Sequence, residues 1–420
     1  MSRCERTRGV LFVTSSYPRW AGDSTTPFVH HLARDLREHG WDVQVLAPHA
    51  PGAMRAETLD GVPVRRFRYA WPESLQTLCY DGGALVKLRA HPLRLLLVPF
   101  LVAAQALTVF RLLVRGRFAL VHSHWLLPQG FTCALAARLL RRTHVVSSHG
   151  GDVFALQGAV SRSAKRFVLR VADAVTANSE ATRQALLSLA RQPEKIVRIP
   201  MGAGVEVEPD PAEVKRLRAE LRAGNGPLLV FVGRLVAEKG AADLLESLAT
   251  LARSLPDARL AVIGDGPERE PLASLARTLG IGHRVRFTGW LSPESVRMHL
   301  LAADIFVGPS RPAPDGWVEA QGLSFVEAML AELPVVATEI GGIPDAIRHE
   351  QTGLLVAPGS PQQITAAVLR LDGDTALSRR LARAARELAQ AEFTRAKSAG
   401  AFAALYGRLA ADADDVRSKK

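Results

Sequence analysis

"DGWVEAQGLSFVEAMLAELPVVAT", residues 315–338, contains an expected loop, helix and strand in a single run. It holds two carboxylates, Glu319 and Glu327, in mostly apolar surroundings, where unpaired carboxylates are rare. Ser324 and Glu327 form the S-x-x-E pattern of a helix capping box. We therefore expect a helix to start near Leu323, with free amide groups that face an anion. The carboxylate of Glu327 then either caps this helix or binds ligand hydroxyl groups.

Apolar strand-like runs alternate with helical segments on both sides of this stretch. The expected strands lie within residues 10–15, 41–48, 118–125, 143–150, 172–179, 195–202, 227–235, 258–267, 284–291, 303–310, 333–338 and 352–359. This alternation predicts an α/β fold with doubly wound parallel sheets. In such folds, ligands bind beyond the carboxyl ends of the strands.

A polar, proline-containing segment near residues 205–211 separates two such series. At 420 residues the chain is long enough for two domains of ordinary size. We therefore predict one domain over residues 1–205 and a second over 206–394. The remaining residues, 395–420, are expected to form a helix and tail, with the helix packed on the first domain.

The formal charge of +12 is unevenly distributed. Residues 1–205 hold 27 Lys and Arg against 13 Asp and Glu, and no acidic residue occurs between Asp81 and Asp152. Long apolar runs within this basic half suit an anionic membrane surface. The alternatives are a solvated basic face, or nucleic acid, for which no recognition motif is present.

Cysteine usage and apolar segments bear on the compartment. The three cysteines, Cys4, Cys79 and Cys133, lie far apart, which indicates a reducing compartment and no structural zinc. The N-terminus has no long apolar signal region. The most apolar run, residues 95–110, contains a proline and a glutamine and falls short of the roughly 20 residues that span a bilayer.

The run "VFVGRLVAEKG" ends an expected strand at Gly233 and places Arg234 and Lys239 in the following turn. An arginine fork and a lysine point charge after a strand-ending glycine suit a diphosphate. The alternative is a pair of ordinary surface cations. Neither a Walker loop nor a complete GxGxxG fingerprint is present, which argues against a nicotinamide-dependent oxidoreductase. Gly264, in "IGDGPERE", marks a second strand-to-helix turn.

The E-x7-E pattern, preceded by "VGPS" and followed by "EAMLAELPVVAT", resembles the donor-site motif of the family 4 glycosyltransferases. "GRLVAEKG", "VIGDGP", "FTGWLS", "GGIPDAI" and "QTGLLV" follow the usual order of that family, and "HSHWLLPQG", "SSHGGDV", "ANSEAT" and "IPMG" match it in the first half. The resemblance covers nearly the whole chain. The stretch "RPAPDGWVEAQGLSFVEAM" is similar to the extended version in bacterial exopolysaccharide transferases of the colanic-acid type.

This resemblance implies a GT-B fold, in which two Rossmann-like domains face each other across a cleft. It also implies a retaining hexosyltransferase that uses a UDP- or GDP-sugar, needs no metal or other cofactor, and acts on a lipid-linked saccharide or polysaccharide precursor. Many relatives dock on the inner membrane face through the N-terminal domain. We therefore expect a cytoplasmic, peripheral membrane protein that does not bind nucleic acid.

The resemblance also assigns roles to individual residues. Catalysis is assigned to His149, Arg234, Lys239 and Glu319. Donor binding is assigned to Gly22, Asp23, Gly233, Gly264, Trp290, Gly322, Leu323 and Glu327. The acceptor side is assigned to His122, His124 and Asp152, although both of these histidines are also compatible with a satisfied core imidazole.

The sequence departs from the family pattern at Ala320 and Gln321, where Gly-Phe is usual, at Glu332, where glycine is usual, and at Ala21. These departures concern the identity of the donor sugar more than the reaction. Two other functions stay open. One is a sugar-phosphate or sucrose-type synthase, or a phosphorylase, with a soluble acceptor. The other is a non-catalytic, membrane-docked scaffold that binds a nucleotide sugar.

Overall fold

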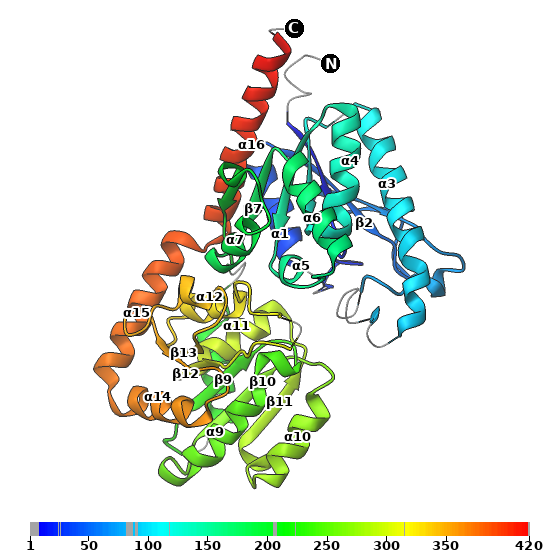
Figure 1. Ribbon diagram of the computed structural model, residues 1–420. Helices are drawn as coiled ribbons and strands as arrows, with labels where there is room; N and C mark the ends of the chain where they lie inside the picture. The colour runs from blue at the N-terminus through cyan, green and yellow to red at the C-terminus, as the bar shows by residue number, and fades with distance from the viewer. Residues whose placement is uncertain are drawn as a thin grey trace. The chain divides into compact units, whose positions relative to one another are not determined.

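The computed structural model describes residues 8–23, 25, 27–80, 87–88, 91–116, 118–204, 208–222, 224–314 and 316–418. Cys4 and Asp315 lie outside these residues. The chain forms two compact units. The first comprises Met1–Pro200 and Arg395–Lys420, and the second comprises Met201–Thr394. Each unit is a parallel-dominated α/β layer structure (Figure 1).

The first unit contains an eight-stranded sheet in the order β3-β4-β2-β1-β5-β6-β7-β8. Its strands are β1 Gly9–Val13, β2 Asp42–Pro48, β3 Ala56–Leu59, β4 Val62–Phe67, β5 Leu120–His124, β6 Thr143–Ser148, β7 Ala174–Ala177 and β8 Ile196–Arg198. All neighbouring pairs are parallel except β3 and β4. The chain leaves β1 toward β2 on one side and returns to β5 on the other, so the sheet changes winding direction at β1.

Helices cover this sheet. They are α1 Pro27–Glu38, α3 Val98–Val114, α4 Phe131–Leu140, α5 Gly151–Phe154, α6 Ala159–Val171, α7 Glu180–Leu187 and α16 Arg395–Ser418. Short helical turns occupy Glu73–Leu75, Pro92–Leu97, Leu126–Gly130 and Pro193–Lys195. α3 packs beside α4, and α16 packs beside α1, as Figure 1 shows.

The second unit contains a fully parallel six-stranded sheet in the order β11-β10-β9-β12-β13-β14. Its strands are β9 Leu228–Val232, β10 Arg259–Ile263, β11 Val285–Gly289, β12 Ile305–Gly308, β13 Val335–Thr338 and β14 Leu354–Val356. Its helices are α8 Pro211–Leu221, α9 Ala241–Ser254, α10 Arg269–Thr278, α11 Pro293–Ala302, α12 Leu323–Leu330, α13 Ile343–Ala346, α14 Pro361–Gly373 and α15 Thr375–Glu392, with short turns at Ala237–Lys239 and Gly282–Arg284. The winding direction changes between β9 and β12.

Side chains of β9 alternate between two cores. Leu229 and Phe231 pack with α9, α10 and α14 on one face. Leu228 and Val230 pack with α11, α12 and α15 on the other. Because both faces are covered, the strands are apolar throughout rather than alternately polar, as is typical of parallel sheets. The predicted α/β class and doubly wound sheets are confirmed.

The β3–β4 hairpin was not expected from the sequence. Asp60 and Gly61 connect its strands with φ angles of 45° and 79°, as a two-residue hairpin turn requires. An Asp-Gly pair between short strand-like runs is the strongest local hairpin signal, so "LDGV" could have revealed it. The hairpin adds an edge to the sheet, far from the winding change at β1.

The units divide at Pro200 and Met201, five residues before the predicted boundary. The side chain of Gln321 explains the difference, because its Oε1 accepts from the Met201 amide (2.9 Å) and its Nε2 donates to the Met201 carbonyl (2.6 Å). The Ala203 amide also donates to the Phe393 carbonyl at 2.9 Å. Met201 is therefore tied to the second unit before the polar segment begins.

The C-terminal helix α16 belongs to the first unit and extends to Ser418, so the helix takes up nearly all of the segment expected to form a helix and tail. The Arg395 guanidinium donates to the Asp35 carboxylate of α1 (2.9 and 2.5 Å). Tyr406 is fully buried beside Trp41, with ring centroids 5.3 Å apart. These contacts attach α16 to its unit.

The segment Pro92–Val114, which ends in α3, is the only helix in the described part of the chain that could cross a membrane by length and composition. It is 28% buried over its most apolar window. The buried side of α3 carries Gln105, which bonds to Thr132 of α4, and Val109, which joins the core. Its outer side exposes large apolar side chains, among them Phe100 and Leu107.

Candidate functional site

The carboxyl ends of β9 and β12 bring the expected donor residues of the second unit together. Gly233, Arg234 and Lys239 follow β9, and Glu319 lies in the loop that follows β12. These two strands are neighbours at the winding change of the sheet. Ligands of doubly wound folds bind at such a point, because the loops on either side diverge there.

Glycines let three loops approach one another at this edge. The Gly233 amide donates to the Ile263 carbonyl (3.0 Å), and the Gly264 amide donates to the Gly289 carbonyl (2.9 Å). Gly264 has a φ of 130°, and a Cβ atom there would lie 2.0 Å from the carbonyl oxygen of Gly233. Only glycine fits this close backbone approach. Gly264 therefore shapes the loop that carries Arg234.

Lys239 and Glu319 form an ion pair at this edge. The Lys239 ammonium donates to Oε2 of Glu319, and the Ser310 hydroxyl donates to the same oxygen at 3.3 Å. Lys239 also lies 5.6 Å from the ring centroid of Trp317, within cation-π range. The side chains are 18% and 8% exposed, so this pair is largely shielded from water. Arg234 is half-buried in the same loop.

Helix α12 starts at Leu323, as the sequence predicted, but the predicted capping box is wrong. Gly322 is the N-cap residue, with φ of 73°, and no side chain caps the helix. Ser324 lies inside the first turn and so cannot be the N-cap. Gly322 is required here, because a Cβ atom would lie 2.4 Å from the Phe325 ring. The first-turn amides are thus left without a side-chain cap, next to Glu319.

Glu327 lies one turn inside α12 and is half-buried. Burial raises the pKa of its carboxyl from 4.5 to about 7, and the charge of Arg297 opposes the rise. Arg297, on α11, donates to the exposed carboxylate of Glu208 at 2.9 Å. Glu327 does not cap its helix, and its burial disfavours the charged form of the carboxyl. We therefore favour the interpretation that this carboxyl binds ligand hydroxyl groups.

Gly22 and Asp23 lie in the loop after β1, at the winding change of the first sheet. The Asp23 carboxylate accepts from the Arg19 amide (2.9 Å), the Arg19 Nε (2.8 Å) and the Thr25 hydroxyl (2.9 Å). Burial alone would raise the pKa of Asp23, but these hydrogen bonds hold it below its usual value. Asp23 therefore organises the loop, while Gly22, with φ of 81°, supplies its turn.

His124 ends β5, His149 directly follows the neighbouring strand β6, and their rings stack. The ring centroids are 5.3 Å apart, and Nδ1 of His124 lies 3.0 Å from Nε2 of His149. Phe28 and Trp125 each lie 5.0 Å from the His149 ring. Burial lowers the pKa of His149 to about 3, so the ring is neutral at physiological pH. Its Nδ1 has no hydrogen-bond partner among the described residues.

His122 does not belong to the acceptor side. Its ring is completely buried, Nε2 bonds to the Ser147 hydroxyl (2.7 Å), and Nδ1 bonds to the Tyr406 hydroxyl (2.5 Å). Both nitrogens are thus occupied inside the unit. The structure corrects the prediction: His122 faces α16 from the middle of the sheet and helps to attach that helix.

Asp152 is also largely buried, and its carboxylate shapes the loop that carries His149. Its two oxygens accept from the Leu126 amide (2.8 Å), the Ser148 hydroxyl (3.0 Å) and the His149 amide (3.1 Å). The structure therefore gives Asp152 a positioning role, and a direct acceptor contact stays a prediction.

Trp290 follows β11 and is 60% exposed. Its position beside the Gly264 loop agrees with a place near a nucleotide base, which stays a prediction. The described residues contain no group of three or more His, Cys, Asp or Glu side chains that could hold a metal ion. Cys79 and Cys133 are buried free thiols.

Comparison with known proteins follows the same division of the chain. Residues 214–388 match the family model described as glycosyl transferases group 1. Residues 25–202 match the glycosyl transferase 4-like domain. The 2-deoxystreptamine glucosyltransferase of Streptomyces kanamyceticus is 31% identical over 291 residues, which cover 66% of this chain and 73% of that protein. The chain belongs to the group 1 glycosyltransferases.

Other similar proteins are named for the transfer of other sugars. A GDP-mannose-dependent alpha-(1-6)-phosphatidylinositol monomannoside mannosyltransferase of Mycobacterium tuberculosis is 34% identical over 247 residues, or 58% of this chain. The match spans 64% of that relative's length. Sucrose-phosphate synthase from Thermosynechococcus elongatus superimposes with a TM-score of 0.77 at 22% identity, covering 96% of this chain and 100% of that one. The last comparison supports the GT-B fold.

The half-buried carboxyl of Glu327 predicts a dependence of stability on pH. Between pH of about 4.5 and about 7, the unfolded Glu327 has lost its proton while the folded one keeps it. Stability is therefore expected to fall as the pH rises through this window. One pKa unit corresponds to about 1.4 kcal/mol, and the side chain keeps some access to water, so the loss is at most about 3 kcal/mol.

Thermal denaturation of the wild type and Glu327→Gln over this pH range checks the prediction. The variant keeps the shape of the side chain but cannot ionise, so its stability should fall less. Parallel curves for the two proteins would assign the pH dependence to another group.

Proposed function

We propose that the chain transfers a hexose from a UDP- or GDP-sugar to a lipid-linked saccharide or polysaccharide precursor, with retention of anomeric configuration and without a metal ion. The observation that carries the proposal is the shielded Lys239–Glu319 pair beside Arg234 and the uncapped start of α12. These groups sit together where a doubly wound sheet binds its ligands. Family membership supports the same reaction.

The proposed chemistry depends on the charge of the leaving group. The acceptor hydroxyl oxygen attacks the anomeric carbon on the face that the diphosphate leaves. The bond between that carbon and the phosphate oxygen breaks, and the departing phosphate takes the proton of the acceptor. Negative charge therefore grows on the diphosphate, and Lys239 and Arg234 stabilise it. In this proposal the two cations neutralise the leaving diphosphate, as a metal ion does in other transferases. A metal ion is therefore not needed for this step.

The other donor contacts follow from position. The carboxylate of Glu319, held by Lys239 and Ser310, can accept hydroxyl groups of the donor sugar. The amides at Gly322 and Leu323 suit an oxygen-rich ligand, since they carry the positive end of the helix dipole. We assign Glu327 to the ribose, Trp290 and Gly264 to the nucleotide, and Gly22, Asp23, His124 and His149 to the face of the first unit that meets the substrates.

The first unit suits an anionic membrane surface. Large apolar side chains are exposed on the outer side of α3 and the turn before it: Leu93 84%, Leu95 63%, Leu96 72%, Phe100 63%, Leu107 50% and Val114 55%. Arg94, Arg111 and Arg115 accompany them, and this stretch of sequence contains no acid. Apolar insertion combined with basic charge is what anionic bilayers bind. We propose a cytoplasmic protein that is peripheral on the inner membrane face and acts in exopolysaccharide biosynthesis.

A sugar-phosphate or sucrose-type synthase with a soluble acceptor is the second candidate. The observation that favours it is the inner side of α3, which is built into the core through Gln105 and Val109. An ordinary core helix would need no membrane. Binding of the full chain to lipid vesicles separates the two candidates.

A thermal-shift panel tests the donor proposal. Purified protein is mixed with UDP, GDP, ADP and their common sugars in the presence of a metal chelator. A ligand that binds only the folded state stabilises it, by about 2.7 kcal/mol when the ligand is present at 100 times its dissociation constant. This stabilisation raises the melting temperature. We expect one nucleotide class to stabilise the protein selectively. The proposal would be contradicted if stabilisation required an added divalent metal ion, or if no nucleotide stabilised the protein. Nucleotide binding without sugar transfer would favour the non-catalytic scaffold.

A further inference from the structure

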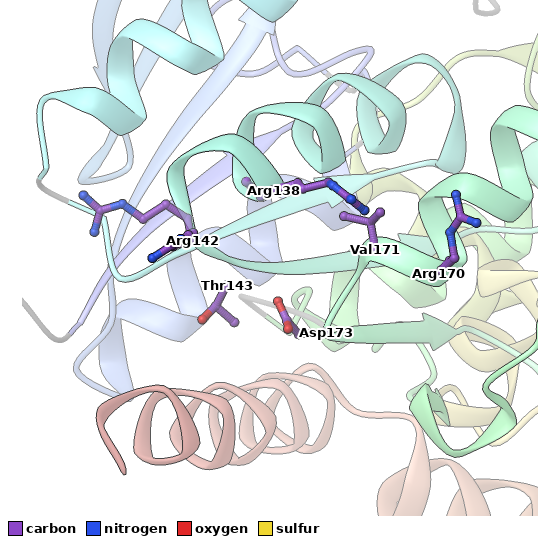
Figure 2. Close-up of a pocket in the computed structure, with 8 residues that line it drawn as sticks. Arg138, Arg142, Thr143, Arg170, Val171 and Asp173 are labelled. Carbon is purple, nitrogen blue, oxygen red and sulfur yellow. The ribbon is translucent and has the colours of Figure 1, made fainter. Parts of the chain in front are cut away.

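A second cationic site lies in the first unit, away from the strand ends that carry His124 and His149. It is a surface pocket of about 380 Å³ lined by the ends of α4 and α6 and the starts of β6 and β7. Its lining residues are Ala137, Arg138, Arg141, Arg142, Thr143, Arg170, Val171 and Asp173. Figure 2 shows Arg138 reaching from α4 toward Val171 at the end of α6. The pocket therefore opens at the amino edge of the parallel sheet.

The charge of this pocket is poorly compensated. Four arginines line it, and Asp173 is its one acid. Asp173 already accepts a hydrogen bond from the His144 amide at 2.8 Å. Burial also raises the pKa of Asp173, which disfavours its charged form. The excess of guanidinium groups leaves a net attraction for an anion.

Part of this arginine cluster has a structural purpose. Cations are common at helix carboxyl ends, where they satisfy free carbonyl groups. Arg142 serves in this way, since its Nη2 donates to the Leu113 carbonyl of α3 at 3.5 Å. Within the described part of the chain, however, Arg138 and Arg141 make no ion pair with a carboxylate. Their planar forks suit the oxygens of a phosphate group.

The pocket borders exposed apolar side chains. Leu139, next to Arg138 on α4, is 73% exposed. Phe110 and Val114, at the end of α3, are 39% and 55% exposed, and the Arg142 bond to Leu113 ties this end of α3 to the pocket. A free phosphate compound has no apolar part that could contact these side chains. A lipid has one, because its acyl region lies close to its phosphate group.

We propose that this pocket receives the phosphate headgroup of an anionic membrane lipid. Arg138 and Arg141 contact the phosphate oxygens, while Leu139 and Val114 enter the interface beside it. The proposal rests on the membrane docking proposed above and adds a specific headgroup site to it. The site is separate from the donor residues, so headgroup binding orients the first unit on the bilayer without occupying the reaction site.

Vesicle co-sedimentation tests the proposal. The full chain is mixed with vesicles of phosphatidylcholine alone and with vesicles that also contain phosphatidic acid. The variant Arg138→Gln/Arg141→Gln is compared with Arg253→Gln/Arg379→Gln, which removes the same charge from exposed helix positions in the second unit. Each basic residue at an anionic surface contributes about 1 kcal/mol, so the pocket variant should bind the phosphatidic acid vesicles about 30-fold more weakly. The control variant should change by less than about 2-fold.

Three outcomes would overturn the headgroup site. If both variants lost vesicle binding equally, the pocket arginines would act only through general charge attraction. Wild-type binding that is the same with and without phosphatidic acid would remove the headgroup site and the preference for an anionic surface, and would leave only apolar docking through α3. Stabilisation of the wild type by pyrophosphate, without any preference among vesicles, would assign the pocket to a soluble anion.

A further variant keeps the two membrane proposals distinguishable. Leu96→Ser/Phe100→Ser removes exposed apolar groups and leaves the arginines in place. It should weaken binding to both kinds of vesicle, while the pocket variant should lose only the preference for phosphatidic acid. Failure of the wild type to bind any vesicle would overturn both proposals and favour the soluble acceptor.

Discussion

Replacing Lys239 with alanine is expected to lower the turnover number about 10²–10³-fold, the usual effect of removing one preorganised charge donor. The ammonium group lies beside Glu319, largely shielded from water, where its charge counts for more than at the surface. Because the charge of the diphosphate grows only as the sugar bond breaks, the loss should appear mainly in turnover rather than in donor affinity. Initial-rate kinetics with the donor from the thermal-shift panel measure both.

The ion pair complicates this experiment, and a second variant resolves it. Lys239→Ala leaves the Glu319 carboxylate, 8% exposed, without its cation, which is itself destabilising. The double variant Lys239→Met/Glu319→Gln removes both charges and should recover much of the lost stability, but not the activity. Lys215→Ala, an exposed lysine on α8 of the same unit, is the matched control. Wild-type turnover in Lys239→Ala and in Arg234→Ala would refute the diphosphate assignment.

Asp152→Ala is expected to lower the melting temperature by about 6–12 °C. The carboxylate accepts three hydrogen bonds within the loop after β6. Leaving buried donors without a partner costs about 1–3 kcal/mol each, so a total of about 3 kcal/mol is a conservative expectation. In a domain of this size, 1 kcal/mol shifts the midpoint by about 2–4 °C. Thermal denaturation measures the change.

Two controls separate positioning from direct contact. Asp152→Asn keeps one acceptor oxygen and should lose less stability. Asp173→Asn changes a carboxylate of the surface pocket that accepts a single strand amide, and its effect should be small. If Asp152→Asn abolished transfer at unchanged stability, Asp152 would contact the acceptor instead of shaping the His149 loop.

Local patterns carried much of this protein's organisation. Apolar runs such as "LLVFV" are buried on both faces, so their strands could be recognised without knowing their neighbours. The start of α12 at Leu323 was also predictable, since it depends on nearby residues. The absence of a capping box was not predictable, because Gly322 occupies the N-cap position and S-x-x-E patterns also occur inside helices.

Side-chain partners distant in sequence could not be inferred in this way. His122 looked like a site residue at the end of a strand, but its partner Tyr406 lies 284 residues further along the chain. In the sequence, Gln321 is only a departure from the family pattern, whereas its hydrogen bonds to Met201 set the boundary of the second unit. Such contacts depend on sheet order and helix packing, which no single segment encodes.

The amino-acid sequence by itself determined the α/β class, the two-unit organisation and the glycines, cations and carboxylates of the loops after β9 and β12, because periodicity, glycine turns and charge are properties of short segments. Tertiary structure alone decided which of these residues meet. The order of β9 and β12 brings Lys239 to Glu319 across 80 residues of chain, and burial raises the pKa of Glu327. The packing of α4 beside α6 likewise collects arginines into a pocket, because proximity and dielectric environment arise only when distant segments fold together.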